Sequence, residues 1–359
     1  MSSNIFFGKR VLITGNTGFK GSWLSLYLQS LGANVYGYSK STLSDDSIFL
    51  SSGLNELIET KYGDIRDFSE ICSYISKIKP NFLFHLAAQP LVRTSYASPL
   101  ETFETNTLGT ANVMESLRLL ADECVGVIIT SDKSYRNVEW LWGYRENDTL
   151  GGADPYSGSK SAAEMVIDSY VKSYFTESEC IKIAIARAGN VIGGGDWSSD
   201  RIVPDAYRAW YNLDSLVLRN PSATRPWQHV LEPIRGYVEL AAKLYDGSIS
   251  TGEAFNFGPE SSDCVSVGEI VSELSKTWHA NLAKIEINSK ANNMKESGLL
   301  RLNCDKSLDM LGWKSALDYR KSVEMTASWY EFYYNNRNKK EIFNFTELQM
   351  KKYLKEIVE

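Results

Sequence analysis

Residues 9–39 read KRVLITGNTGFKGSWLSLYLQSLGANVYGYS, and they predict a strand, a helix and a second strand in direct succession. The first strand covers 9–14, where apolar residues dominate a short run. The helix covers 18–32 and closes at a glycine, and the second strand covers 33–39. A strand that leads through one helix into a neighbouring strand is the unit from which parallel sheets are built.

The turn between the first strand and the helix reads TGNTGFKG and carries Gly15, Gly18 and Gly21 at three-residue spacing. Residues without a side chain permit a tight turn, a close approach of backbone to a pyrophosphate, and close contact between helix and strand. The N–H groups and the positive dipole at the helix N-terminus then favour phosphate binding. Together with the strands on either side, this turn predicts a dinucleotide site.

The same alternation continues through the first half of the chain. Further strands are expected at 58–63, 81–88, 125–130 and 181–188, and helices at 67–78, 99–121 and 155–175. This order predicts an α/β fold with a doubly wound, Rossmann-type parallel sheet.

The alternation stops after about residue 190 and gives way to Gly- and Pro-containing loops and shorter elements. We therefore expect a dinucleotide-binding domain at 1–190, joined again by about 233–260. A smaller mixed α/β substrate-binding domain is expected at 191–232 and 261–359, and it includes a C-terminal tail that ends in an amphipathic helix.

Composition excludes several classes of protein. The formal net charge of −6 argues against a sequence-independent nucleic-acid binder, which needs a basic face. We expect no membrane segment, because no stretch reaches the roughly 18 unbroken apolar residues of a span, and no secretory signal. The five scattered cysteines indicate a cytoplasmic protein with reduced thiols, and three histidines far apart in sequence give no reason to expect a metal.

The end of the second strand carries Ser39 and Lys40, where NAD sites usually place an acidic residue for the ribose hydroxyls. Lys40 would suit a 2′-phosphate or lie in solvent, so this position leaves NAD and NADP open. Asp64 follows the third strand and would either accept from the adenine amino group or cap the next turn.

YSGSK places Tyr156 and Lys160 four residues apart, after a proline that suits the first helical position. On a helix both side chains share one face, and the ammonium would lower the pKa of the phenol towards neutrality. Tyr36 and Lys40 have the same spacing, but on a strand that offset separates them by about 13 Å. Tyr156 and Lys160 are therefore the predicted pair.

TGxTGxxG, HLAA at 85–88, a serine after the fifth strand and YxxxK together resemble the extended short-chain dehydrogenase/reductase family, over about residues 9–330. The resemblance implies a nicotinamide cofactor, a Tyr–Lys–Ser/Thr centre and a nucleotide-sugar substrate. It also implies a homodimer or homotetramer, with pairing through the helices at 99–121 and 155–175.

Within that family, nucleotide-sugar 4,6-dehydratases carry Ser/Thr-Asp-Glu after the fifth strand, and here the residues are Ser131, Asp132 and Lys133. The Asp-Lys pair looks like the branch that acts on CDP-glucose to supply 6-deoxy and 3,6-dideoxyhexoses of the O-antigen type. Five strings share this likeness: GFKGSWLSLYLQSLGA (18–33), AAQPLVRTSY (87–96), WGYREND (142–148), RAGNVIGGGDW (187–197) and ATRPWQHVLEP (223–233). A dehydratase for another nucleotide sugar, or an epimerase or reductase on this scaffold, is the alternative.

The resemblance implies C4 oxidation, loss of water across C5 and C6, and hydride return to C6. Tyr156 would take the C4 hydroxyl proton while Ser131 bonds the same oxygen. Protonated Asp132 would donate to the departing C6 hydroxyl. Lys133, desolvated and with a lowered pKa, would remove the C5 proton; in the alternative, it stays charged and stabilises the enolate.

The same resemblance assigns the binding residues. NAD contacts are expected from Gly15, Asn16, Thr17, Gly18, Phe19, Lys20, Gly21, Ser39, Asp64, Ile65, Ala87, Ala88, Gln89, Thr130, Tyr156 and Lys160. Substrate contacts are expected from Gln89, Arg93, Asn190, Arg201, Ile202, Arg225, His229 and Arg301. Among these, Arg225 suits the diphosphate well, because it lies in an otherwise uncharged, Pro- and Trp-containing string and arginine presents a planar fork of donors.

Overall fold

The computed structural model describes residues 4–42, 44–260, 264–278, 284–287 and 299–357. Its centre is a parallel sheet with the strand order β11-β6-β5-β4-β1-β2-β3. The strands are β1 (Arg10–Thr14), β2 (Asn34–Ser39), β3 (Glu59–Tyr62), β4 (Phe82–His85), β5 (Cys124–Ile129), β6 (Ile181–Ala188) and β11 (Ala254–Phe257). The predicted doubly wound sheet is confirmed. Its strand order reverses between β1 and β4, where ligands bind in such folds.

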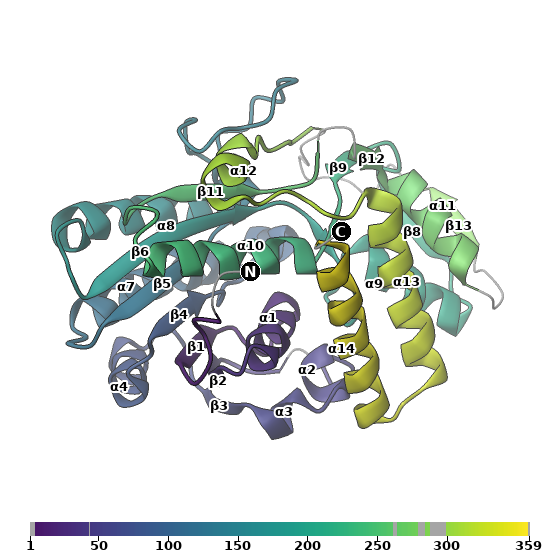
Figure 1. Cartoon of the computed structure of the whole chain (residues 1–359). Helices are drawn as coiled ribbons and strands as arrows, with labels where there is room; N and C mark the ends of the chain where they lie inside the picture. The colour runs from purple at the N-terminus through teal and green to yellow at the C-terminus, as the bar shows by residue number, and fades with distance from the viewer. Residues whose placement is uncertain (1–3, 43, 261–263, 279–283, 288–298, 358–359) are drawn as a thin grey trace.

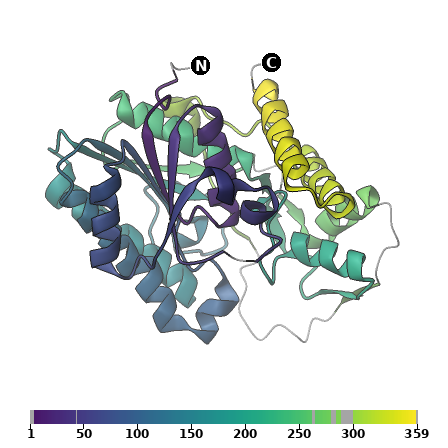
Figure 2. The same ribbon diagram turned by 90° about the horizontal axis from the view of Figure 1, so that it is seen from below.

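Helices cover both faces of the sheet (Figures 1 and 2). One apolar cluster joins the sheet to α4 (Phe68–Ile78), α7 (Gly109–Arg118) and α8 (Pro155–Tyr170). The cluster on the other face includes α1 (Phe19–Ser30) and α10 (Leu231–Tyr245). The buried strands read as nearly continuous apolar runs because both of their faces are covered.

The helix expected at 99–121 is divided in three. α6 (Pro99–Phe103) passes through a π-helical turn at Glu104–Leu108 into α7, and a short α5 (Val92–Ala97) precedes it. The side chain of Asn106, in the π turn, accepts from the N–H of Gln89 at 2.8 Å and donates to Ser159 Oγ at 2.9 Å. These bonds tie the loop after β4 to α8, and periodicity alone could not reveal them.

A second lobe lies beyond the carboxyl edge of the sheet (Figure 1). Its strands form three two-stranded pairs: β7 (Val191–Ile192) with β10 (Gln228–His229), β8 (Leu216–Leu218) with β13 (Ile285–Ile287), and β9 (Thr224–Pro226) with β12 (Cys264–Ser266). Its helices include α9 (Ile202–Asn212), α11 (Val267–Thr277), α13 (Tyr319–Asn335) and α14 (Lys339–Glu356), whereas α12 (Asp305–Leu311) packs against β11 at the edge of the central sheet. The smallest helices, α2 (Ile48–Ser51) and α3 (Leu54–Leu57), lie between β2 and β3.

α13 and α14 form the yellow pair beside the sheet in Figure 2. The amphipathic helix predicted at the end of the chain is confirmed as α14, which buries Ile342, Met350 and Tyr353. Trp329 of α13 packs directly on Gly194, where a Cβ would meet the indole at 1.9 Å. This close contact joins α13 to the loop that follows β7. α10 and β11 return to the central sheet, where 233–260 was expected.

Candidate active site

A cavity of about 750 Å³ opens at the carboxyl edge of the sheet and is bounded by both lobes. The first wall is the turn between β1 and α1. Gly15 has a left-handed φ of +78°, and a Cβ there would lie 2.8 Å from the N of Ala87. A Cβ on Gly21 would lie 2.1 Å from the carbonyl oxygen of Gly15. These contacts are the physical reason for two of the three glycines.

Nearly all the residues predicted to bind the cofactor line this cavity. They are Gly15, Thr17, Gly18, Phe19, Lys20, Gly21, Ser39, Asp64, Ile65, Ala87, Ala88, Gln89, Thr130, Tyr156 and Lys160. Asn16 is the exception, and its predicted contact with the cofactor stays a prediction. It is fully buried beneath the turn, where it accepts from Ser39 Oγ at 2.8 Å and donates to Thr60 Oγ1 at 2.8 Å.

Asp64 faces the cavity but is engaged within the protein. Its carboxylate accepts from the backbone N–H of Arg66 at 3.0 Å and from that residue's guanidinium at 2.7 Å. These bonds hold the pKa of Asp64 below its usual range, although its partial burial opposes them. Asp64 therefore caps the turn, and its predicted contact with the adenine amino group stays a prediction. Lys40 is exposed and pairs with Glu101 at 3.2 Å.

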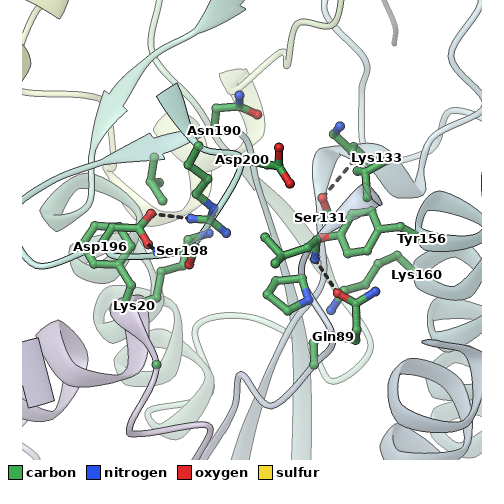
Figure 3. A pocket seen from close by; sticks show the side chains of 18 of the residues that line it. Lys20, Gln89, Ser131, Lys133, Tyr156, Lys160, Asn190, Asp196, Ser198 and Asp200 are labelled. Atoms are coloured by element: carbon green, nitrogen blue, oxygen red, sulfur yellow. Dashed lines mark hydrogen bonds and ion pairs between the residues drawn. The ribbon is translucent and has the colours of Figure 1, made fainter. Parts of the chain in front are cut away.

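Ser131, Asp132 and Lys133 follow β5 in a short turn that opens into the cavity (Figure 3). The Ser131 hydroxyl donates to Asp132 Oδ1 at 3.0 Å and accepts from the N–H of Lys133 at 3.2 Å. The Asp132 side chain is almost fully buried, and burial raises its pKa, against the lowering effect of Lys133 and Ser131. A raised pKa favours the protonated carboxyl that a general acid requires.

Lys133 is half-buried, so the structure shows part of the desolvation that was expected for it. It stands on the turn beside Ser131, on the same side of the cavity as Tyr156 and Lys160 (Figure 3).

Tyr156 and Lys160 lie in the first turns of α8, which begins with Asp154 as its N-cap and Pro155 at the first position. Burial raises the pKa of Tyr156 to about 12, while a hydrogen bond with Ser131 lowers it. The expectation that Lys160 brings this pKa towards neutrality is therefore wrong in direction for this structure. Burial disfavours the charged form of both Tyr156 and Lys160. It therefore also lowers the pKa of Lys160, to about 8.

The opposite wall comes from the second lobe, which supplies Arg201, Ile202 and Arg225 of the predicted substrate residues. Gln89, Arg93 and Asn190 also line the cavity, from the first lobe. Arg201 pairs with Asp196 at 2.7 Å, and Arg93 pairs with Asp200 at 2.8 Å. The amide of Gln89 bonds Thr102 and the N–H of Leu91, so its side chain serves packing as well as facing the cavity.

His229 does not line the cavity, and its prediction as a substrate contact is wrong. Arg301 does not line it either, although its neighbour Leu300 does, and its substrate contact stays a prediction. The His229 ring is fully buried against the edge of Trp23 and accepts from the N–H of Leu231 at 3.3 Å. It belongs to the core beneath β10. Arg301 lies in the strand segment whose carbonyl pairs with Tyr144. His279 lies outside the described residues.

Sequence reasoning missed a buried ion pair behind the site. Glu164 accepts from Arg187 Nε at 2.8 Å and from Thr130 Oγ1 at 2.6 Å, and Ser134 Oγ donates to it at 2.9 Å. It therefore holds both ends of the Ser131–Lys133 turn against α8 and β6. Glu164 lies one helical turn after Lys160, so helical spacing could have placed it near the site. No pattern in the sequence pointed to its partner Arg187 on β6.

The fold and this arrangement of serine, tyrosine and lysine define a nucleotide-sugar-modifying enzyme of the short-chain dehydrogenase/reductase type. The family described as GDP-mannose 4,6 dehydratase matches residues 12–326, and the chain belongs to that family. A CDP-glucose 4,6-dehydratase of Salmonella typhimurium is 42% identical over 335 residues, which cover 92% of this chain and 93% of that protein.

Solved structures share the same fold. An epimerase from Methanothermobacter thermautotrophicus superposes with a TM-score of 0.78 at 25% identity and covers 92% of this chain and 95% of its own. A dTDP-glucose 4,6-dehydratase from Bacillus anthracis, in complex with NAD, has a TM-score of 0.75 at 20% identity and covers 90% and 97%. Within the described residues, no helix has the length and apolar content of a membrane span.

Proposed function

We propose that the protein is an NAD-dependent CDP-glucose 4,6-dehydratase that forms CDP-4-keto-6-deoxy-D-glucose. The observation that carries the proposal is the Asp132-Lys133 pair beside Ser131, at one cavity with Tyr156. An epimerase or simple reductase has no use for an acid and a base at this point. The 42% identical relative supports the CDP-linked substrate.

The N-terminus of α1 explains why this part of the cavity suits a dinucleotide. Its N-terminus has no side-chain cap and no acidic residue in the first turn, so its N–H groups are available to phosphates at the cavity wall. When bound there, NAD would accept a hydride from C4 and return it to C6. Its oxidised form would add a positive charge near the phenol of Tyr156. Ser39, rather than an acidic side chain, would meet the ribose.

Tyr156 takes the proton of the C4 hydroxyl, and Ser131 donates to the same oxygen as it becomes a carbonyl. The hydrogen bond between the two already lowers the pKa of the phenol in part. The resulting ketone acidifies the C5 proton, which Lys133 removes. Asp132 gives its proton to the C6 hydroxyl as that group departs, and its burial favours the protonated state that this step needs.

Arg225 and Arg201, from the second lobe, and Asn190, directly after β6, would hold the diphosphate. All three line the same cavity. We expect Arg225→Ala to weaken the binding of both CDP-glucose and CDP by about tenfold or more, because a bidentate donor to phosphate is lost. Calorimetric titration measures both affinities, and unchanged values would contradict a role for Arg225 in binding the diphosphate.

The active unit is proposed to be a homodimer or homotetramer in the cytoplasm, paired through α6, α7 and α8. Exposed apolar side chains on this face support the pairing, with Leu100 77% and Met165 68% exposed. The division at 1–190 with about 233–260, against 191–232 and 261–359, is proposed for the cofactor and sugar-nucleotide domains.

One experiment tests the function directly. Purified protein is incubated with CDP-, dTDP-, UDP- and GDP-sugars and with NAD or NADP, and products are identified by mass. The expected result is loss of one water from CDP-glucose without net NADH. Turnover of another nucleotide sugar instead would assign that sugar as the substrate, and a product of unchanged mass would indicate an epimerase.

A further inference from the structure

Gly189 directly follows β6 and lines the cavity between the sheet and the second lobe. A fold requires glycine where φ lies in the left-handed region, or where another atom approaches the backbone too closely for a side chain. The first condition does not hold, because the φ of Gly189 lies outside that region. Any need for glycine at this position therefore comes from its neighbours.

The neighbour that comes closest is the carboxyl group of Asp132. A Cβ on Gly189 would lie 3.3 Å from Asp132 Oδ2 and 3.6 Å from Pro226 Cγ. The first distance is tighter than most contacts of a real Cβ, so the carboxyl would have to shift. The backbone cannot retreat instead, because the preceding Ala188 is paired with Phe257 of β11 in the sheet. A side chain at position 189 would therefore act directly on the carboxyl.

The two oxygens of this carboxyl have different roles. The Ser131 hydroxyl donates to Oδ1 at 3.0 Å, which makes Oδ1 the acceptor. Burial raises the pKa of Asp132, and the proton of the neutral carboxyl then belongs on Oδ2. The oxygen that carries the proton is thus the one that a side chain at position 189 would touch.

We propose that Gly189 is a positioning residue for the elimination, because its missing side chain keeps Asp132 Oδ2 where it can protonate the C6 hydroxyl. This inference rests on the proposed function. In that step Lys133 takes the C5 proton, the electron pair left on C5 forms the C5–C6 double bond, and the C6–O bond breaks with its own pair. The leaving oxygen takes the Oδ2 proton and departs as water. C4 oxidation uses Tyr156 and Ser131, so a side chain at position 189 would impair the elimination and spare the oxidation.

The test follows NADH absorbance in single turnovers of Gly189→Ala. NADH appears when C4 is oxidised and decays when the hydride returns to C6, after the water has left. With CDP-glucose we expect normal appearance and a decay slowed by about tenfold, because the proton donor is displaced. With CDP-6-deoxy-6-fluoroglucose we expect both phases at the wild-type rate, because fluoride leaves without a proton from Asp132.

Gly258→Ala, after β11, is the matched control. A Cβ there would lie 3.4 Å from Leu302 Cβ, and Gly258 does not line the cavity, so both phases should be unchanged with both substrates. Normal loss of fluoride from the same Gly189→Ala sample shows that the variant folds and binds its ligands.

The proposal is overturned by wild-type decay with CDP-glucose in Gly189→Ala, by equal slowing with both substrates, or by loss of NADH appearance. If the wild-type protein forms no dehydrated product from CDP-glucose, the proposed function fails instead.

Discussion

Lys133 has the most demanding task of any single residue in the proposed reaction, because an amine must be neutral to accept the C5 proton. Its side chain is half-buried, and its backbone N–H is fixed to Ser131 Oγ at 3.2 Å. The alternative interpretation keeps Lys133 charged as a stabiliser of the enolate. The two differ in whether C5 exchanges its hydrogen with solvent.

We expect Lys133→Met still to reduce NAD with substrate but to wash no solvent deuterium into C5, with product formation reduced by about 100-fold or more. Mass spectrometry of recovered sugar in deuterated water measures both. Exchange at the wild-type rate would assign the base elsewhere and leave Lys133 as the stabilising charge.

Lys160 illustrates a conflict between function and stability at one residue. Its pKa in the folded protein is about 8, against 10.5 when unfolded, so folding carries a cost wherever the unfolded amine is charged. The cost is fully present below about pH 8 and disappears as pH rises towards 10.5, because the unfolded state then also loses its proton.

We therefore expect Lys160→Met to lose activity and yet to raise the free energy of unfolding at pH 7 by up to about 3 kcal/mol. Urea denaturation at pH 7 and pH 10 measures the effect, and the gain should shrink at the higher pH. An equally large gain at both pH values would contradict the proposed origin in the charge of this lysine.

At the scale of elements, one buried ion pair fixes the catalytic turn between α8 and β6. Glu164 is 1% and Arg187 5% exposed in their side chains, and the pair also engages Thr130 and Ser134. A charge left without its partner in this environment is far more costly than the pair itself is favourable.

Glu164→Gln should accordingly destabilise the protein by about 3–5 kcal/mol, since it leaves the guanidinium of Arg187 without its counter-charge. The double variant Glu164→Gln/Arg187→Met removes both charges and should recover part of the loss. Chemical denaturation of the two variants gives the comparison. No recovery in the double variant would mean that the hydrogen bonds to Thr130 and Ser134, rather than the charges, hold the turn.

At the scale of the whole molecule, the cavity exists because the second lobe covers the carboxyl edge of the sheet. The proposed subunit interface lies elsewhere, on α6, α7 and α8, so association would stiffen α8 without closing the site. Leu100 and Met165 are the exposed apolar side chains that association would bury.

We expect Leu100→Lys/Met165→Lys to shift the protein to monomers in analytical ultracentrifugation. Leu348→Lys, at a 61% exposed leucine on α14, should leave the oligomer intact and is the matched control. A wild-type protein that sediments as a monomer would remove the proposed association altogether.

Several features followed from the sequence alone because they are local. The strand–turn–helix at 9–39, the glycine turn and the Tyr156–Lys160 helix depend on periodicity, on residues without a side chain and on an N-cap, which act within a few residues. The parallel sheet followed from repetition of that unit. The family followed in the same way, from motifs that lie in short segments.

Tertiary structure decided what depends on distant neighbours. It buried Asn16 and His229 away from the cavity, split the helix at 99–121 through bonds from Asn106, and raised the pKa of Tyr156 where helical spacing predicted a fall. It also paired Glu164 with Arg187. The reason is common to all: burial and electrostatic environment are set by segments far apart in the chain, which no local pattern records.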